Sequence, residues 1–159
     1  MDNRYVKIFA SGSKAPLKAT PGHFATNHAH INYYLDMTTL KTRLSEAQEV
    51  AKHLAERFLF DKVDTIVCLE GTQVIGAYLA EELTRAGVLS TNAHKTIYVI
   101  TPEYNSNSQM VFRENILPMV HGKNVVILTA VVTTGLSLNK SIEAIQYYGG
   151  KLQSAAAVF

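Results

Sequence analysis

The residues best suited to chemistry form one short turn, Thr133-Thr134-Gly135-Leu136-Ser137, which follows a long apolar run. Where a strand turns into a helix, several backbone N–H groups are unpaired and the helix start carries partial positive charge. The hydroxyls of Thr133, Thr134 and Ser137 add hydrogen-bond donors, and Gly135 allows the backbone to come close to an anion. The segment is therefore predicted to bind a phosphate group.

Two other phosphate-binding motifs fit this turn less well. A nucleoside-triphosphate P-loop requires a Gly-Lys-Ser/Thr sequence, and no lysine occurs in the turn. A dinucleotide-binding fingerprint requires three spaced glycines after its strand, whereas Gly135 stands alone. The remaining alternative is an ordinary helix start with Thr and Ser at its cap, but the strand, turn and helix signals agree with one another and favour a ligand site.

Alternating strand and helix signals would place this turn at the edge of a largely parallel sheet. Nearly all-apolar runs predict strands at 63–69, 96–100, 125–132 and 153–159. Apolar residues at three- and four-residue steps predict helices between them, at 45–58, 74–83 and 137–148. Ligands of open α/β folds bind at the carboxyl ends of such strands, which is where the turn would lie.

Individual residues predict where some of these helices begin and end. Ser45 and Gln48 have the spacing of a capping box, which predicts the start of the first helix, and Gly87 predicts the end of the second. The first forty residues are less regular, with strands expected at 5–9 and 31–37 and turns at 11–16 and 20–22. The segment 102–122 is too long for an ordinary connection and predicts a functional lid.

The composition is typical of a globular protein that binds neither nucleic acid nor membranes. Of the 159 residues, 47% are hydrophobic and 18% are charged, and the formal net charge is only +2 with scattered basic residues. Cys68, the single cysteine, lies in an apolar run and is expected to be a small core residue. No signal-peptide core or membrane-spanning run is visible, so we expect a cytoplasmic protein. The apolar end at Phe159 suggests further C-terminal sequence.

With these elements, the sequence resembles the type I phosphoribosyltransferases, and among them the orotate phosphoribosyltransferases. Their signature contains four apolar residues, two acidic residues, two apolar residues and Thr-Thr-Gly-Gly-Thr/Ser. The chain matches it at 125–128, at 131–132, at Thr133-Thr134-Gly135 and at Ser137. The resemblance implies one α/β domain over 1–159, in which helices flank a mostly parallel sheet. A small N-terminal hood would span about 1–40 and the core 41–159.

The resemblance also implies an activity, the transfer of phosphoribose from phosphoribosyl pyrophosphate to orotate or another nucleobase, with Mg²⁺ and in a homodimer. The turn 133–137 would hold the 5′-phosphate. Glu70-Gly71-Thr72-Gln73 would correspond to the pyrophosphate-binding loop, and 102–122 to a mobile catalytic loop that contains Arg113. His30–Asp36 resembles a strand of the hood.

Three departures from the family pattern affect substrate binding. Thr129 and Ala130 stand at the ribose-binding positions, where the family has an acidic pair that accepts hydrogen bonds from the ribose hydroxyls. Such bonds contribute about 1.5–3 kcal/mol each, so losing both weakens ribose binding by roughly two to four powers of ten. Glu70 places an acid, and no cation, where pyrophosphate would bind, and Leu136 replaces the second glycine of the turn.

Different classes of function therefore remain open at the level of sequence. In an active transferase, Glu70 would act through magnesium, and Arg113 would neutralise pyrophosphate once the loop closes. In a catalytically impaired homologue, the same fold would bind or sense a nucleoside monophosphate or a phosphoribosyl ligand without turnover. A protein-interaction subunit with an empty pocket is a third, less specific interpretation.

Histidines near the N-terminus raise a separate question of metal binding. His28 and His30 would lie on one face of a strand, with His23 and Asp36 nearby in the sequence. A zinc site requires four ligands on a firm scaffold, and the sequence indicates neither a full set of ligands nor a rigid scaffold in this segment. We therefore predict a polar hood surface here and no metal site.

Overall fold

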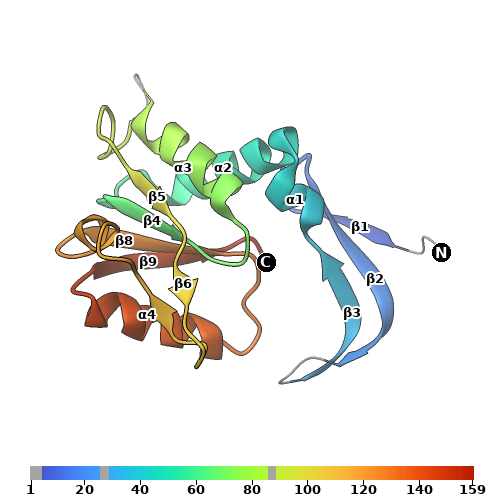
Figure 1. Cartoon of the computed structure of the whole chain (residues 1–159). Coiled ribbons are helices and arrows are strands. Elements are labelled where there is room, and N and C mark those ends of the chain that lie inside the picture. Colours follow the sequence, from blue (N-terminus) through green and yellow to red (C-terminus); the bar gives the residue numbers. More distant parts are fainter. Residues whose placement is uncertain (1–4, 26–28, 86–88) are drawn as a thin grey trace.

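The computed structural model describes residues 5–25, 29–85 and 89–159, which form an N-terminal antiparallel sheet and an α/β core (Figure 1). The elements in chain order are β1 (Val6–Phe9), β2 (Pro16–Ala25), β3 (His30–Asp36), α1 (Thr38–Thr42), α2 (Leu44–Phe58), β4 (Thr65–Cys68), α3 (Gln73–Thr84), β5 (Tyr98–Ile100), β6 (Glu103–Tyr104), β7 (Met110–Val111), the 3-10 turn η1 (Leu117–Met119), β8 (Asn124–Thr129), α4 (Leu136–Tyr147) and β9 (Lys151–Ala157).

The core sheet has the strand order β5-β4-β8-β9, and all neighbouring strands in it are parallel. The predicted parallel sheet is therefore confirmed. In the central pair, Thr65 of β4 lies opposite Val125 of β8, and Cys68 lies opposite Leu128. Because both strands run in the same direction in this register, the turns that follow them emerge side by side at one edge of the sheet.

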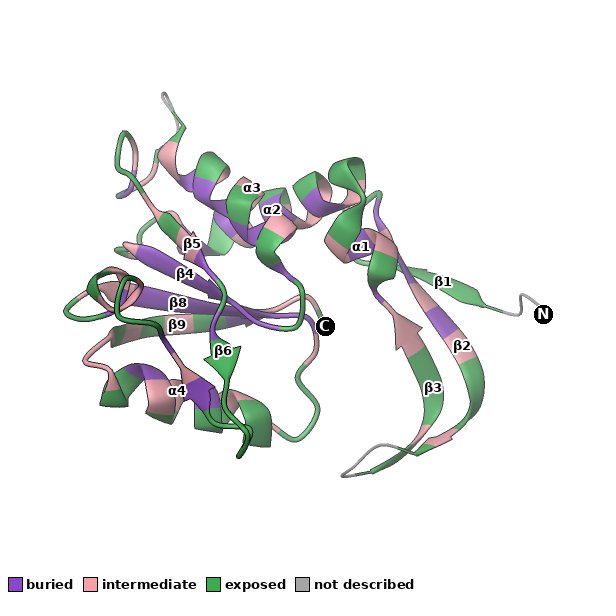
Figure 2. Cartoon of the chain, viewed as in Figure 1, coloured by how far each residue is buried: buried purple, intermediate pink, exposed green. Residues whose placement is uncertain are grey.

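Helices cover both faces of this sheet, α2 and α3 on one face and α4 on the other (Figure 1). The strand side chains alternate between the two layers. Ile66 and Leu128 pack toward α2 and α3, whereas Val67 and Ile127 pack toward α4. Figure 2 shows β4 and nearly all of β8 as buried. Burial on both faces explains why these strands are apolar without alternation.

The N-terminal sheet has the order β1-β2-β3 and leaves many of its side chains exposed (Figure 2). It contacts the core through a small apolar cluster in which Leu17, Met37 and Leu40 pack with Ala130, the residue that follows β8. The position of this sheet relative to the core therefore depends on the backbone just beyond the central strand.

The predicted turn at 20–22 is wrong, because β2 runs straight through it. The pairing of β2 with β3 shifts register between Pro21 and Phe24, which is an irregularity within a continuous strand. Pro21, which has no backbone N–H to donate, lies at this register shift, and irregularities of this kind are among the places where a sheet tolerates proline.

The start of α2 also differs from the prediction. Ser45 and Gln48 do not form a capping box, because α2 begins at Leu44 with Arg43 as its N-cap and without a side-chain cap. The short helix α1, which the sequence pattern did not indicate, ends at the same residue, where the Arg43 N–H donates to Thr39 O at 2.9 Å. One residue therefore closes α1 and opens α2, which leaves no position for a serine cap.

The connections around β5 complete the core. Helix α3 ends at Thr84, and its predicted stop, Gly87, lies outside the described residues. The segment 102–122 contains the hairpin of β6 and β7, followed by η1. In the ranges that the structure describes, no helix combines the length and apolar character that a bilayer crossing requires.

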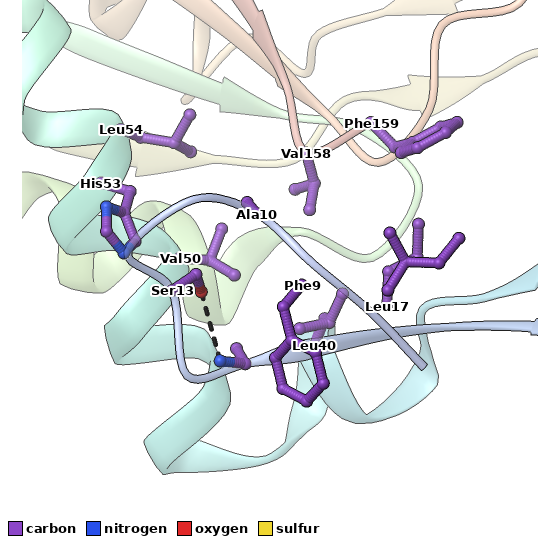
Figure 3. A pocket seen from close by; sticks show the side chains of 12 residues that line it. Phe9, Ala10, Ser13, Leu17, Leu40, Val50, His53, Leu54, Val158 and Phe159 are labelled. Carbon is purple, nitrogen blue, oxygen red and sulfur yellow. Dashed lines mark hydrogen bonds between the residues drawn. The ribbon is translucent and has the colours of Figure 1, made fainter. Parts of the chain in front are cut away.

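An apolar pocket of about 240 Å³ lies between the N-terminal sheet and the core (Figure 3). Its walls come from β1 and the following turn, from α1 and α2, and from the last residues of the chain; Phe9, Leu40 and Val158 are examples. His53 of α2 also lines it, with Nε2 3.4 Å from Glu49 Oε1. The pocket shares no lining residue with the cleft at the carboxyl edge of the sheet.

Close packing of α3 on β4 depends on Gly76. A side chain at this position would overlap the sulfur of Cys68 and approach Val99 Cγ1 to 3.3 Å. Cys68 is fully buried, which confirms the expectation of a small core residue, and this burial raises the pKa of its thiol to about 12. The contact between α3 and β4 is therefore so closely packed that it leaves no room for a larger side chain at position 76.

We predict that Gly76→Ala lowers the free energy of unfolding by about 1–3 kcal/mol, because the added methyl group overpacks the contact with Cys68. Adding Cys68→Ala should recover part of this loss by removing the sulfur. Urea unfolding of the wild type, the two single variants and the double variant measures the coupling. Strictly additive effects would contradict this account of the packing.

We also expect Cys68 to resist alkylation in the folded protein. Burial favours the neutral thiol, so a pKa of about 12 leaves very little reactive thiolate in mildly alkaline buffer. Iodoacetamide labelling, followed by mass spectrometry, should be slow in buffer and complete in denaturant, where the pKa returns to its ordinary value. Equal labelling rates under the two conditions would contradict the burial of this side chain.

Candidate functional site

The turn after β8 has the strand–turn–helix form that the sequence predicted, with two differences at its ends. β8 ends at Thr129, so residues 131–132 leave the sheet earlier than predicted, although Val132 N still donates to Phe159 O at 3.0 Å. Helix α4 begins at Leu136, and its N-cap is Gly135 in the left-handed conformation, with φ 78°. A side chain at this backbone conformation would be strained, which explains the glycine.

The turn exposes unpaired backbone donors. Thr133, Thr134 and Ser137 are exposed, and Leu136 N approaches Thr134 Oγ1 only at 3.4 Å. Within the part of the chain that the structure describes, the N–H groups of Thr133, Thr134, Gly135 and Ser137 make no hydrogen bond. The first turn of α4 contains no acidic residue, so the positive end of the helix is uncompensated. An oxyanion could therefore approach these amides directly.

A cleft of about 1350 Å³ lies in front of this turn and is lined by it. The ends of β4 and β8 contribute Glu70 and Thr129, α4 contributes Lys140 and Glu143, and the β6–β7 hairpin contributes Tyr104. The volume exceeds the roughly 300–1,000 Å³ of typical small-molecule pockets, so there is room for a phosphorylated sugar together with a second group.

Glu70 connects the two central strands at the floor of this cleft. Its carboxylate Oε2 accepts a hydrogen bond from Thr129 Oγ1 at 2.9 Å and a longer one from Val131 N at 3.4 Å. Its backbone O accepts a hydrogen bond from Lys41 Nζ of α1 at 2.8 Å. The adjacent parallel strands β4 and β8 thus bring an acid from one turn beside the start of the other.

The rest of the segment 70–73 does not line the cleft. Gly71 and Gln73 are exposed, whereas Thr72 is fully buried at the N-cap of α3 and its hydroxyl donates to Leu69 O at 2.8 Å. Of the residues that the sequence assigned to a pyrophosphate-binding loop, the structure brings only Glu70 next to the turn 133–137.

The two predicted ribose-binding positions have different surroundings. Thr129 is buried but lines the cleft with its hydroxyl engaged by Glu70. Ala130 is buried among Leu17, Met37 and Leu40 of the N-terminal segment and does not line the cleft. Its side chain therefore serves the contact between the two sheets.

Arg113 lies apart from the other predicted site residues. It follows β7, is exposed, forms an ion pair with Glu103 at 2.7 Å and does not line the cleft. Exposed ion pairs of this kind contribute about 0–1 kcal/mol, so the pair is easily exchanged for another partner. The segment that carries Arg113 does reach the cleft through Tyr104 and residues 107–111.

The sequence did not single out three residues that line the cleft or contact Glu70, namely Lys140, Lys41 and Tyr104. Lys140 lies three positions after Ser137, a helical spacing that would have placed both on one face. Lys41 belongs to no motif in the sequence, but its Nζ reaches the backbone of Glu70. Partial burial and the charge of Glu70 raise the pKa of Tyr104, which keeps its hydroxyl a neutral donor.

The histidines of the N-terminal sheet form a pair at the hairpin end. His23 Nε2 lies 3.0 Å from His30 Nδ1, and the rings stack with centroids 5.0 Å apart. His28 lies outside the described residues, and Asp36 accepts a hydrogen bond from Thr38 N at 2.9 Å. Among the described residues, no group of three His, Cys, Asp or Glu side chains is arranged to hold a metal ion.

Comparisons with known proteins identify the fold. No family model matches the sequence, and no curated protein matches it. The structure of an orotate phosphoribosyltransferase from Mycobacterium tuberculosis H37Rv is similar to this one, with TM-score 0.59 and 16% sequence identity. The match covers 89% of this chain and 76% of the enzyme's chain. The same enzyme in complex with 5-phospho-alpha-D-ribosyl 1-diphosphate matches with TM-score 0.57 and 15% sequence identity. This match covers 78% of this chain and 66% of the enzyme's chain.

A longer protein shares this similarity. UMP synthase from Leishmania donovani matches 87% of the chain, with TM-score 0.65 and 19% identity, but the match spans only 28% of that protein. The chain therefore has the type I phosphoribosyltransferase fold and resembles the orotate enzymes in structure. This agrees with the α/β class and the parallel sheet that the sequence predicted.

Gly135 and Gly122 offer a matched test of the turn. Both have positive φ, 78° and 70°, with open space where a Cβ would lie, but Gly122 precedes β8 at the opposite edge of the sheet. Alanine at either should lower the free energy of unfolding by about 1–2 kcal/mol. Only Gly135→Ala should weaken binding of inorganic phosphate, measured by NMR titration. Equal phosphate binding by the two variants would contradict the assignment of the turn.

Proposed function

We propose that this protein is a phosphoribosyltransferase-like enzyme that transfers phosphoribose from phosphoribosyl pyrophosphate to a nucleobase, with orotate as the first candidate. One observation carries the proposal. The turn with the unpaired amides of Thr133, Thr134, Gly135 and Ser137 lines a large cleft at the carboxyl edge of the parallel sheet, in a chain with the fold of orotate phosphoribosyltransferases. The turn would hold the 5′-phosphate of the substrate, and Lys140 would add positive charge beside it.

The reaction would take place at the anomeric carbon of the ribose. A ring nitrogen of the base, after losing its proton, forms the new C–N bond, and the C–O bond to pyrophosphate breaks with both electrons leaving on pyrophosphate. Positive charge develops on the sugar ring and negative charge on the leaving group, so the task of the protein is electrostatic. Lys41, held at the turn after β4, and Arg113, once released from Glu103, are the cations proposed to meet the leaving group.

Magnesium is part of the proposal. Mg²⁺ prefers oxygen ligands and commonly binds one or two carboxylates together with substrate phosphates. The cleft walls offer two carboxylates of this kind, Glu70 and Glu143. When bound, the ion would neutralise charge on the leaving pyrophosphate, and these side chains would orient its coordinated waters.

The N-terminal sheet and a second copy of the chain are also part of the proposed enzyme. The N-terminal sheet would act as the hood, and the whole chain as one cytoplasmic domain that forms a homodimer. Exposed apolar residues on this sheet, including Val6, Ile8 and Phe9 of β1, support a second copy as the partner.

A direct assay tests the transferase. We expect pyrophosphate release when the protein is incubated with phosphoribosyl pyrophosphate, Mg²⁺ and orotate or another nucleobase. Ser137→Asp should weaken binding of phosphoribosyl pyrophosphate by about a hundredfold or more, because it places a carboxylate at the phosphate turn. Asn139→Asp is the matched control, since it adds the same charge in the same helical turn but does not line the cleft.

The outcomes separate the two classes of function. Pyrophosphate release that Ser137→Asp abolishes and Asn139→Asp preserves would support the transferase. Saturable binding of a nucleoside monophosphate without release would support a binding or sensing protein with this fold. Failure of every phosphorylated ligand to bind would contradict the proposed site.

A further inference from the structure

Glu70 has a backbone conformation that its own side chain disfavours. Its φ is 54°, and Gly71 follows with φ 78°, so two successive residues are left-handed. A non-glycine residue in this region is uncommon and costs conformational energy, which surrounding contacts must offset. These contacts are the hydrogen bond from Leu69 N to Leu128 O at 2.8 Å and the bond from Lys41 Nζ to Glu70 O.

This conformation brings the Glu70 carboxylate to the end of β8. The hydrogen bonds from Thr129 Oγ1 and Val131 N both reach Oε2. Across residues 5–25, 29–85 and 89–159, Oε1 accepts no hydrogen bond, although an ionised carboxylate can accept about four in all. Glu70 is exposed and lines the cleft, so its unused acceptor capacity is available to a ligand.

The charge of this carboxylate is not neutralised by a neighbouring cation. Lys41 bonds to the backbone carbonyl of Glu70, and no ion pair with the carboxylate occurs among the described residues. A free carboxylate so close to a phosphate-binding turn opposes anion binding through Coulomb repulsion. The part of the ligand that lies beside Glu70 must therefore carry hydrogen-bond donors or a cation, because only these gain from the negative charge.

We propose that Glu70 recognises the hydroxyl groups of a 5′-phosphorylated sugar and makes the cleft selective for ribose phosphates. Val131, which donates to Glu70, is two residues from Thr133, a separation of at most about 7 Å along the chain. A phosphate held at 133–137 would thus leave its sugar ring within reach of the Glu70 carboxylate, which lines the same cleft. Thr129 positions this carboxylate through its hydroxyl. The inference rests on the proposed function, because it requires a phosphate at the turn.

Three ligands of increasing hydroxyl content isolate this role. They are inorganic phosphate, tetrahydrofurfuryl phosphate, which has the ring without hydroxyls, and ribose 5-phosphate. Binding to the wild type and to Glu70→Gln is measured by NMR titration with EDTA present, which removes metal ions. The wild type should prefer ribose 5-phosphate to tetrahydrofurfuryl phosphate by about tenfold to a hundredfold, and Glu70→Gln should lose most of this preference.

The direction in which each variant changes ligand affinity distinguishes recognition of the sugar by Glu70 from a structural role of this residue. Glu70→Gln removes a negative charge from the cleft, so its affinity for inorganic phosphate should stay the same or increase. Glu81→Gln makes the same charge change on the exposed face of α3, outside the cleft, and should leave the preference for ribose 5-phosphate unchanged. Thr129→Val removes only the hydroxyl that positions Glu70, so it should reduce the preference in part.

Each other outcome overturns the inference in an identifiable way. If the wild type binds none of the three ligands, both this inference and the proposed phosphate site are wrong. If it binds inorganic phosphate and Glu70→Gln keeps the full preference for ribose 5-phosphate, only the role of Glu70 is wrong. Loss of affinity for all three ligands in Glu70→Gln would show a structural role. A preference that appears only when Mg²⁺ replaces EDTA would show that the carboxylate binds the ion and not the hydroxyls.

Discussion

Parallel pairing of β4 with β8 brings together two turns whose key residues, Glu70 and Thr129, are 59 positions apart in the sequence. Each strand is covered by helices on both faces, so its side chains contribute to the core and leave only the carboxyl ends for function. Everything proposed for the cleft depends on this pairing. A change of register between the two strands would move Glu70 away from Thr129 and from the turn 133–137.

The electrostatics of the cleft follow from the same arrangement. The start of α4 supplies partial positive charge and free amides, whereas the end of β4 supplies a full negative charge at Glu70. Two opposite charges in neighbouring turns suit a ligand that has an anion at one end and hydroxyl donors or a cation further along. The separation of positive and negative charge within the cleft, rather than its net charge, distinguishes it from a general anion-binding surface.

Sequence predicted the core well because its signals are local and strong. The runs 63–69 and 125–132 are apolar without alternation, and the turn 133–137 combines glycine with hydroxyl residues. The errors have physical causes: α1 is too short to show periodicity, and β2 accommodates Pro21 at its register shift against β3. The contacts of Glu70 with Thr129 and Lys41 join distant segments, and no local pattern indicates them.

The fold and the site of this chain depend on different properties of its sequence. The fold is shared with proteins of very different sequence, because burial patterns rather than individual residues determine the layers. At the site the individual residues determine the contacts, as 129 and 130 show. Thr129 has a partner in Glu70, whereas Ala130 is part of the contact between the two sheets.

Ala130 also limits which side chains its position can hold. A carboxylate at this position would be desolvated against Leu17, Met37 and Leu40, at a cost of several kcal/mol unless it found a partner. An acidic residue at 130 is therefore tolerated only if substitutions in the N-terminal segment make that contact polar. The packing of the N-terminal sheet on the core thus keeps charge away from the residue that follows β8, whatever ligand the neighbouring cleft holds.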